Sequence, residues 1–384
     1  MRLIKEGKAR LLLPDSVKIS RKAEAFYNPA MAVNRDFSVV FLQPELRGKR
    51  ILDMLAGTGV RGIRYVLECG AEECWFIEKN PAAYKYLEKN IELNSIKGKA
   101  FLADARQLCL QWQEAGEQFF FVDLDPFGSP IHFLYFAGLA LDRRRSLLAV
   151  TATDLGALFG QSRQATVRKY CAVNDKRLPW TEELGLRILL GAVAREMLRH
   201  ELGIKPLGYH FWKHFVRVYV EVSTRLEKEC IQYLGFACFE QGKVHFLPLK
   251  DLDSGKTGEQ RYGVLWAGKL VSAEFINKLI NEVINSSFNE NFNYLSNAHH
   301  VLKYLQLLKE EAACQEQQPA AWAYSLPRLA RRYKLSKTLA LDKLVEALRQ
   351  HGYAASRSPL YSMNSVRTDA PEYVIVELIK ELIK

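Results

Sequence analysis

The sequence predicts an α/β protein, with a Rossmann-like domain built on a parallel sheet and a smaller α+β domain after it. Three observations support this. Short apolar runs alternate with helical segments between residues 50 and 151. The glycine pattern Gly57-x-Gly59-x-x-Gly62 follows the first run, and an acidic residue closes each of the first three. Such alternation is typical of βαβ units, whose strands are parallel and whose crossovers are right-handed.

The predicted elements of this domain follow in a regular order. The first strand, Arg50–Leu55, leads through the glycine loop into a helix that extends to Glu68. Apolar runs bounded by turn residues predict the other strands. These are Cys74–Ile77, Lys99–Leu102, Phe119–Val122 and Ser146–Thr151, and they alternate with helices at Pro81–Asn94, Arg106–Glu114 and Pro130–Leu141.

The flanking segments carry fewer signals. Before the sheet, the LLLP and VKIS pieces are typical of short strands, and a helix is predicted at Phe37–Leu46 with Asp36 or Ser38 as its cap. After the sheet, we expect a long helix near Glu183–Leu202 and an alternating strand at Phe215–Ser223.

A domain boundary is predicted near residues 225–230. Residues 1–225 would then hold an N-terminal extension and the sheet domain, and residues 226–384 a second domain. Within the second domain, Ser325–Tyr353 predicts two helices that would belong to a winged-helix-like module. Basic residues surround the turn between these helices, namely Arg331, Arg332, Lys334 and Lys337.

Charge and cysteine content narrow the class of protein. The chain has 384 residues and a formal net charge of +11, which favours a polyanionic partner. Its seven cysteines form no C-x-x-C pair, so neither a disulfide framework nor a zinc cluster is indicated, and a reducing cytoplasm fits best. No apolar run is long enough for a membrane span, and the first residues make a poor signal peptide.

The acids that close the first three strands are Asp53, Glu78 and Asp104. The glycine pattern alone also fits a nicotinamide dehydrogenase. However, a carboxylate at Asp53 would sit badly beside a pyrophosphate and could instead pair with a cationic amino-acid group. Glu78 is placed for ribose hydroxyls, and Asp104 with the Ala105 N–H for an adenine. The ordinary alternative for each acid is a helix N-cap.

The stretch Phe119–Pro130, FFFVDLDPFGSP, carries the strongest chemical signal. Because strand side chains alternate, Asp123 and Asp125 are expected on one face at the end of the strand. The Asp125 carboxylate and the Pro126 carbonyl could accept hydrogen bonds from an amine, while Phe127 stacks on a planar base. The alternative is a strand with a capping Asp, a turn, and Phe127 in the core.

These segments together resemble the tRNA (guanine-N2)-dimethyltransferase family of class I methyltransferases. The resemblance covers nearly the whole chain and rests on seven segments. They are FYNP with NRD (26–36), 53–62, DLDPFGSP (123–130), TATD (151–154), GLRILLG (185–191), VRVYV (216–220) and RTDAP (367–371). Many relatives carry a C-terminal cysteine cluster, but Cys230 and Cys238 lack its paired spacing, so a metal site is not expected.

The resemblance implies transfer of one or two methyl groups from S-adenosyl-L-methionine to the N2 amine of guanine-26 in tRNA, with no stable protein partner. The implied catalytic residues are Asp125, Pro126 and Phe127, with Asp125 also able to take the released proton. Arg35 would contact the cofactor carboxylate or the substrate backbone. The implied cofactor-binding residues are Arg35, Asp53, Ala56, Gly57, Thr58, Gly59, Arg61, Glu78, Lys79, Asp104, Ala105 and Asp123.

Two other functions remain open from the sequence: an adenine-N6 or other nucleic-acid amino-methyltransferase, and a non-catalytic RNA-binding protein with this fold. DPFG in place of D-P-P-aromatic argues against the first, and the intact Asp125-Pro-Phe against the second. Four basic clusters are candidates for phosphate contacts. They are Arg143–Arg145, Arg163 with Arg168 and Lys169, Lys176 with Arg177, and Arg328–Lys337.

Overall fold

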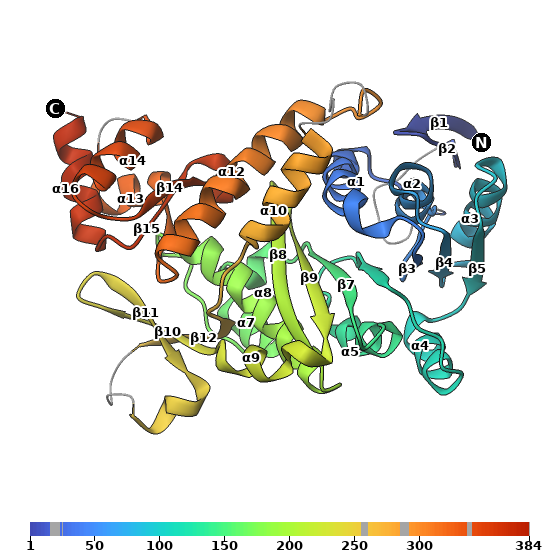
Figure 1. Ribbon diagram of the computed structural model, residues 1–384, viewed down its shortest axis with the longest axis horizontal. Helices are drawn as coiled ribbons and strands as arrows, with labels where there is room; N and C mark the ends of the chain where they lie inside the picture. The colour runs from blue at the N-terminus through green and yellow to red at the C-terminus, as the bar shows by residue number, and fades with distance from the viewer. Residues whose placement is uncertain (16–23, 25, 255–259, 285–291, 336–339, 384) are drawn as a thin grey trace.

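A seven-stranded sheet organises the chain (Figure 1). The computed structural model describes residues 1–15, 24, 26–254, 260–284, 292–335 and 340–383. The strand order is β5-β4-β3-β6-β7-β9-β8. The parallel strands are β3 (Arg50–Asp53), β4 (Glu73–Glu78), β5 (Gly98–Leu102), β6 (Phe121–Leu124) and β7 (Ser146–Ala152). The predicted parallel βαβ alternation is therefore confirmed.

An antiparallel pair completes the sheet. Strand β9 (Phe215–Ser223) runs antiparallel to β7 and to the edge strand β8 (Gly203–Trp212). The connecting helices are α2 (Val60–Cys69), α3 (Pro81–Leu93), α4 (Ala105–Glu114), α5 (Ile131–Ala140), α6 (Leu155–Leu158), α7 (Arg163–Tyr170) and α8 (Thr181–Leu198). The long helix predicted to reach Leu202 thus ends at Leu198.

The segment before the sheet forms a hairpin and a helix. Strands β1 (Arg2–Glu6) and β2 (Ala9–Leu13) pair antiparallel, which confirms a strand at LLLP, whereas VKIS lies outside the described residues. Helix α1 (Ala32–Leu46) begins five residues before the predicted start, after a single 3-10 turn. The Asn28 side chain caps that turn by accepting from the Ala30 N–H, so the predicted cap at Asp36 or Ser38 is wrong.

Beyond β9 the chain first forms a small three-stranded sheet, seen in yellow in Figure 1. Its strands are β10 (Leu234–Glu240), β11 (Lys243–Pro248) and β12 (Arg261–Trp266), preceded by α9 (Glu227–Gln232) and followed by α10 (Ala273–Leu279). Within the part of the chain that the structure describes, no helix combines the length and apolar character that a membrane span requires.

From Ala298 on, the chain forms a helix–strand–helix–helix–strand–strand unit, with a short helix between its last two strands and a further helix at its end, drawn from orange to red in Figure 1. Its antiparallel sheet has the order β13-β15-β14. This is the order of elements in a winged helix, and a role of this unit in tRNA binding stays a prediction. The elements are α12 (Ala298–Gln317), β13 (Trp322–Ser325), α13 (Leu326–Tyr333), α14 (Leu341–Gln350), β14 (Ala355–Ser358), α15 (Leu360–Met363), β15 (Ser365–Thr368) and α16 (Glu372–Leu382).

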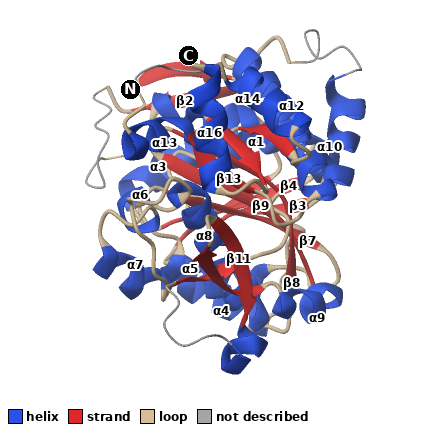
Figure 2. Ribbon diagram, turned by 90° about the vertical axis from the view of Figure 1, so that its left-hand side faces the viewer, coloured by secondary structure: helices blue, strands red, loops and turns tan. Residues whose placement is uncertain are grey.

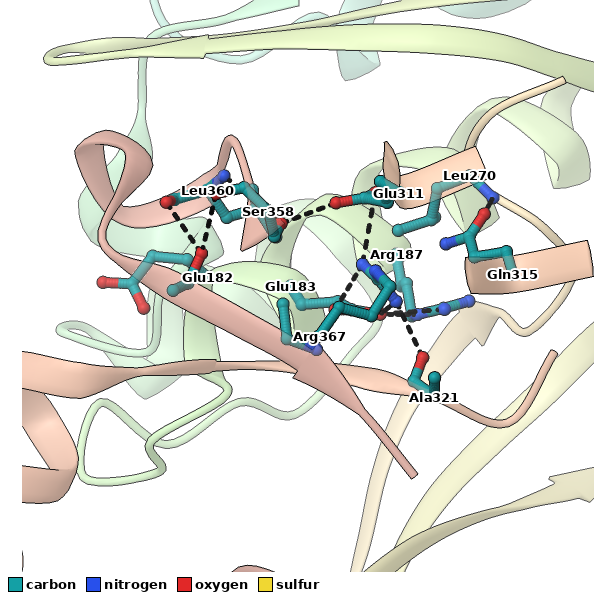
Figure 3. A network of polar contacts seen from close by, with 12 residues as sticks. Glu182, Glu183, Arg187, Leu270, Glu311, Gln315, Ala321, Ser358, Leu360 and Arg367 are labelled. Atoms are coloured by element: carbon teal, nitrogen blue, oxygen red, sulfur yellow. Dashed lines mark hydrogen bonds and ion pairs between the residues drawn. The ribbon is translucent and has the colours of Figure 1, made fainter. Parts of the chain in front are cut away.

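A buried polar network joins this C-terminal unit to the sheet domain (Figure 3). Arg367 on β15 pairs with Glu183 on α8 at 2.8 Å and with Glu311 on α12 at 3.2 Å. Arg187 pairs with Glu183 at 2.8 Å, and Ser358 donates to Glu311 at 2.6 Å. All four charged side chains are at most 1% exposed. The charges of two arginines and two glutamates therefore balance inside a cluster that is closed to bulk solvent. The network fixes the C-terminal unit on α8.

The network predicts a large stability loss on truncation. Arg367→Met should lower the free energy of unfolding by about 3–5 kcal/mol, because it leaves Glu311 and Glu183 buried with a cation removed. Arg357→Met on the neighbouring strand is the matched control. Arg357 is 39% exposed and pairs with Glu310 and Asp342 at the surface, so its loss should cost less than about 1 kcal/mol. Urea unfolding measures both, and equal losses would contradict the role of the network.

Candidate active site

The candidate site lies where the strand order reverses. From β3, the strands β4 and β5 extend to one side of the sheet, and β6 and β7 to the other. Asp53 at the end of β3 is in register with Asp123 on β6. In open α/β sheets, ligands bind outside the carboxyl ends of the strands at such a reversal. The strand-end residues of the predicted site therefore lie together at the carboxyl ends of the parallel strands.

The glycine loop has the geometry that its sequence predicted. Gly59 has a φ of +80°, a left-handed conformation that favours glycine, and α2 begins directly after it. A Cβ at Gly62 would lie 2.3 Å from the Phe76 ring, so the third glycine allows helix α2 to pack closely on the sheet. The Gly57 N–H donates to Glu78 at 2.8 Å, which ties the loop to the end of β4.

The three strand-end acids have different environments. Asp53 is 3% exposed and accepts from the Gly62 N–H at 3.1 Å, and burial together with the nearby Asp123 raises the pKa of Asp53 to about 7. Glu78 also accepts from the Asn80 N–H at 2.6 Å, and burial raises its pKa. Asp104 caps α4 and pairs with Lys79 and Arg106, whose hydrogen bonds hold its pKa low. The N-cap alternative therefore applies to Asp104.

Strand β6 begins two residues later than predicted, at Phe121. The register with β3, in which Ile51 faces Phe121, sets this start, while Phe119 makes only an isolated bridge to Leu141. The strand also ends two residues later than predicted, at Leu124, so Asp123 lies inside it and only Asp125 follows its end. The expectation that both aspartates stand at the end of the strand is wrong in this respect.

Asp125 is held by one arginine of helix α2. The Arg61 Nε–H donates to Asp125 at 2.7 Å, and the two side chains form an ion pair at 2.6 Å. Burial alone would raise the pKa of Asp125, but the charges of Arg61 and Arg217 outweigh it and hold the pKa below its ordinary value. Asp125 is thus an ionised hydrogen-bond acceptor, and its side chain remains 22% exposed.

Phe127 does not pack in the core, which was the ordinary alternative for this residue. The residue is 44% exposed, and its ring packs against the Phe26 ring in a T-shaped arrangement with the centroids 4.3 Å apart. The following turn is firmly held, because the Gly128 N–H donates to the Thr153 hydroxyl at 2.8 Å and the Thr153 N–H donates to the Gly128 carbonyl at 3.0 Å. Two motif segments therefore fix an aromatic ring beside an acid at the site.

Asp123 belongs to a buried frame beneath the site. Its two oxygens accept from Arg217 at 3.0 and 2.6 Å, and the Tyr65 hydroxyl donates to it at 2.6 Å. Arg217 also donates to Thr151 at 2.8 Å. Asp123 is 1% exposed and Arg217 is fully buried, so both oxygens of this carboxylate are already paired inside the protein. The expected contact of Asp123 with the cofactor would require it to leave Arg217.

The NRD segment lies inside helix α1 and supplies a second buried frame. Arg35 donates twice to Glu6 of the N-terminal hairpin, both at 2.6 Å, and Asp36 pairs with Arg64 at 2.8 Å. Arg35 would therefore have to leave Glu6 to contact a cofactor. Glu6 was missed from the sequence, because nothing near it in the chain signals a buried partner.

Three buried polar atoms around the site have no hydrogen-bond partner among the described residues. They are Asn34 Nδ2, Thr58 Oγ1 and Arg61 Nη1. Buried polar groups are almost always paired, so a cluster of unpaired ones marks a place that a polar ligand completes. Together with Glu78, they fit a ligand that carries a carboxylate and sugar hydroxyls. The remaining members of the predicted set are Ala56, which is buried in the loop, and Ala105, the first residue of α4.

Comparison with known proteins adds to this geometry. The model of the N2,N2-dimethylguanosine tRNA methyltransferase family matches residues 7–380. The chain is 34% identical over 396 residues to tRNA (guanine(26)-N(2))-dimethyltransferase of Pyrococcus horikoshii, covering 99% of this chain and 98% of the relative. It is 35% identical over 401 residues to the enzyme of the same name from Thermococcus kodakarensis, covering 99% of each.

A solved structure agrees over the same length. The complex of Trm1 from Pyrococcus horikoshii with S-adenosyl-L-methionine superposes with a TM-score of 0.81 at 31% identity, covering 98% of this chain and 99% of that one. The sheet domain accordingly has the methyltransferase fold, with an additional C-terminal domain.

Proposed function

Since the chain belongs to the N2,N2-dimethylguanosine tRNA methyltransferase family, we infer that it is an S-adenosyl-L-methionine-dependent tRNA (guanine-26-N2)-dimethyltransferase. The observation that carries this inference is the exposed Phe127 beside Asp125 at the end of β6, next to the glycine loop. That pairing offers an acceptor and a stacking surface to a planar amine.

The substrate of this activity is tRNA, and we propose that the protein acts in the cytoplasm. No disulfide joins the seven cysteines, which suits a reducing compartment.

The proposed cofactor site spans the glycine loop and the acids at the ends of β4 and β5. Glu78 would bind the ribose hydroxyls, and the unpaired Nη1 of Arg61 the carboxylate. Asp104, which also caps α4 and pairs with Lys79 and Arg106, would accept from the adenine amine beside the Ala105 N–H. Asp53 would attract the ammonium group, which its position below the loop supports. The glycine loop would form the floor of the cofactor site, through Ala56, Gly57, Thr58 and Gly59. Lys79 would lie at the rim of this site. When bound, S-adenosyl-L-methionine supplies an electrophilic sulfonium methyl group.

This assignment predicts the ligand preference of the chain. Calorimetry should detect binding of S-adenosylhomocysteine and no binding of NAD, although both ligands contain adenosine. The reason is that a pyrophosphate would meet the carboxylates of Asp53 and Glu78, whereas an amino-acid moiety meets a carboxylate and the free arm of Arg61. Binding of NAD without S-adenosylhomocysteine would overturn the methyltransferase assignment.

The substrate amine needs activation, because the N2 lone pair of guanine is delocalised into the ring. We propose that the amine donates one hydrogen bond to Asp125 and one to the Pro126 carbonyl. These two hydrogen bonds would draw the lone pair out of conjugation. Phe127 would hold the base by stacking. Positioning of this kind supplies a large part of the acceleration in group transfer. After transfer, the protonated amine is a far stronger acid than a carboxylic acid, so even a weakly basic Asp125 can accept the proton.

A guanine inside a stacked helix cannot reach such a site, so the base must be flipped out. The proposal as a whole is tested by incubating the protein with radiolabelled S-adenosyl-L-methionine and either unmodified tRNA or a DNA duplex that contains the same sequence. Incorporation into tRNA alone supports it, and incorporation into DNA alone would favour a DNA amino-methyltransferase.

A further inference from the structure

Helix α7 lies directly beside the candidate active site. The hydroxyl of Tyr170, at the end of α7, donates to Asp154 at 2.7 Å and accepts from Ser129 at 3.2 Å. Lys169 pairs with Asp154 at 2.9 Å. Ser129 follows the DPFG turn, and Asp154 closes the TATD segment. The buried face of α7 is therefore anchored to both motif segments that shape the site.

Helix α7 also carries exposed basic residues. Arg163 lies at its start and Arg168 in its last turn, and the loop after the helix exposes Lys176 and Arg177. Among the described residues, no carboxylate lies within ion-pair distance of Arg163, Arg168 or Lys176, and Arg177 pairs with Asp175 at the surface. Three of these four cations therefore have no carboxylate partner within the part of the chain that the structure describes.

The loop after α7 is joined to helix α13 of the C-terminal unit. Arg328 donates to the Lys176 carbonyl at 2.7 Å and pairs with Glu182 at 2.6 Å, and the Ser325 N–H donates to the Pro179 carbonyl at 2.8 Å. Figure 2 shows α13 above α6, and α6 above α7, on the left side of the molecule. The buried network of Figure 3 holds the C-terminal unit in this position.

Helix α13 continues the basic surface. Arg331 and Arg332 are exposed in its last turn, and the acid that pairs with Arg332, Glu372, is only 2% exposed. Several charges lie near one residue: burial and the Asp175 carboxylate raise the pKa of Tyr262, while Arg177, Arg163 and Arg332 act to lower it. Cations from three separate segments thus lie near Tyr262, and the acids among them are mostly buried: Glu182 and Glu372 are at most 8% exposed, and the Asp175 side chain is 22% exposed.

We propose that these residues form one phosphate-binding track that leads from the mouth of the active site over α7 and onto α13, and that the track holds the tRNA backbone. The track comprises Arg163, Arg168, Lys176, Arg177, Arg331 and Arg332. This inference rests on the proposed function. A duplex or folded RNA suits the track because its phosphates are regularly spaced anions, and each cation that contacts one releases a counterion. The junction between α7 and α13 is fixed. It would therefore set the distance in the tRNA between the modified base and the phosphates that α13 binds.

The test compares two doubly reversed variants of the full-length protein. Arg163→Glu with Arg168→Glu alters the track. The control, Lys85→Glu with Lys89→Glu, makes the same charge change at two exposed positions of helix α3, which packs on β4 and β5 at the other side of the sheet. Filter binding at several salt concentrations gives the dissociation constant for tRNA and its log–log slope. We expect the track variant to bind more weakly, with the slope reduced by about two, one for each lost phosphate contact. The control should keep the slope of the unaltered protein.

Calorimetry with S-adenosylhomocysteine reports whether each variant is folded. Where the reversed variant fails to fold, Arg163→Gln with Arg168→Gln should still lower the slope. An unchanged slope in a folded track variant, or equal weakening by the control, would overturn the track. If the unaltered protein methylates tRNA while the track variant binds normally, only the track is wrong. If the unaltered protein methylates no tRNA, the proposed function itself fails.

Discussion

Asp125→Asn is expected to lower the rate of methyl transfer by about a hundredfold or more while leaving tRNA and cofactor binding intact. The substitution keeps the shape of the side chain and one acceptor oxygen, but it removes the charge that polarises the guanine amine and the acceptor for its proton. It also removes the anion that Arg61 holds at 2.6 Å. The measurement is single-turnover transfer with both ligands saturating, so that a change in affinity does not enter the rate.

The neighbouring Asp123 provides the comparison for this experiment. Near-normal turnover of Asp125→Asn would refute its assignment as the acceptor. An equal loss of chemistry in folded Asp123→Asn and Asp125→Asn would mean that the two carboxylates act as a unit. The structure favours separate roles, because Asp123 is 1% exposed and bound to Arg217, whereas Asp125 retains exposed surface.

Asp123→Asn should act on folding instead, with a loss of about 3–5 kcal/mol in the free energy of unfolding. It leaves the fully buried Arg217 without the carboxylate that receives two of its hydrogen bonds. Glu72→Gln is a suitable control, since Glu72 pairs with Lys97 at 2.8 Å while both side chains are 60% exposed. Solvent screens this exposed pair, so its loss should change the free energy of unfolding far less than the loss of the buried one.

Chemical denaturation of both proteins, with S-adenosylhomocysteine binding measured in parallel, distinguishes the two roles of Asp123. A stable Asp123→Asn protein that has lost cofactor binding would show that Asp123 serves the cofactor and not the frame. Normal stability and normal binding together would contradict both roles.

The sheet could be predicted from the sequence because its signals are local. Each strand is a short apolar run, and glycine or acidic residues mark its end, so a window of a few residues contains the information. The third glycine of the loop is an example: Gly62 packs on Phe76 as the pattern implies. The register of β6 could not be read this way, because pairing with Ile51 on a distant strand decides where it begins.

The buried charges were beyond local patterns for a related reason. Asn34, Arg35 and Asp36 precede the helix predicted at Phe37–Leu46, but they lie inside α1, where partners elsewhere in the chain balance the charges of Arg35 and Asp36. Glu6 and Arg64, for instance, are 58 residues apart and meet at 2.9 Å. Arg217 reaches Asp123 across 94 residues. A sequence window contains only one half of such a pair, so it cannot distinguish a buried ion from a solvated one.

The most direct test of the central claim is nucleoside mass spectrometry of tRNA after incubation with the protein and labelled S-adenosyl-L-methionine. Two transcripts should be compared, one with guanine at position 26 and one with adenine there. We predict labelled N2-methylguanosine or N2,N2-dimethylguanosine from the first transcript, at position 26, and no labelled nucleoside from the second. Equal labelling of both transcripts, or label on an adenine, would contradict the assignment of guanine-26 N2 as the methyl acceptor.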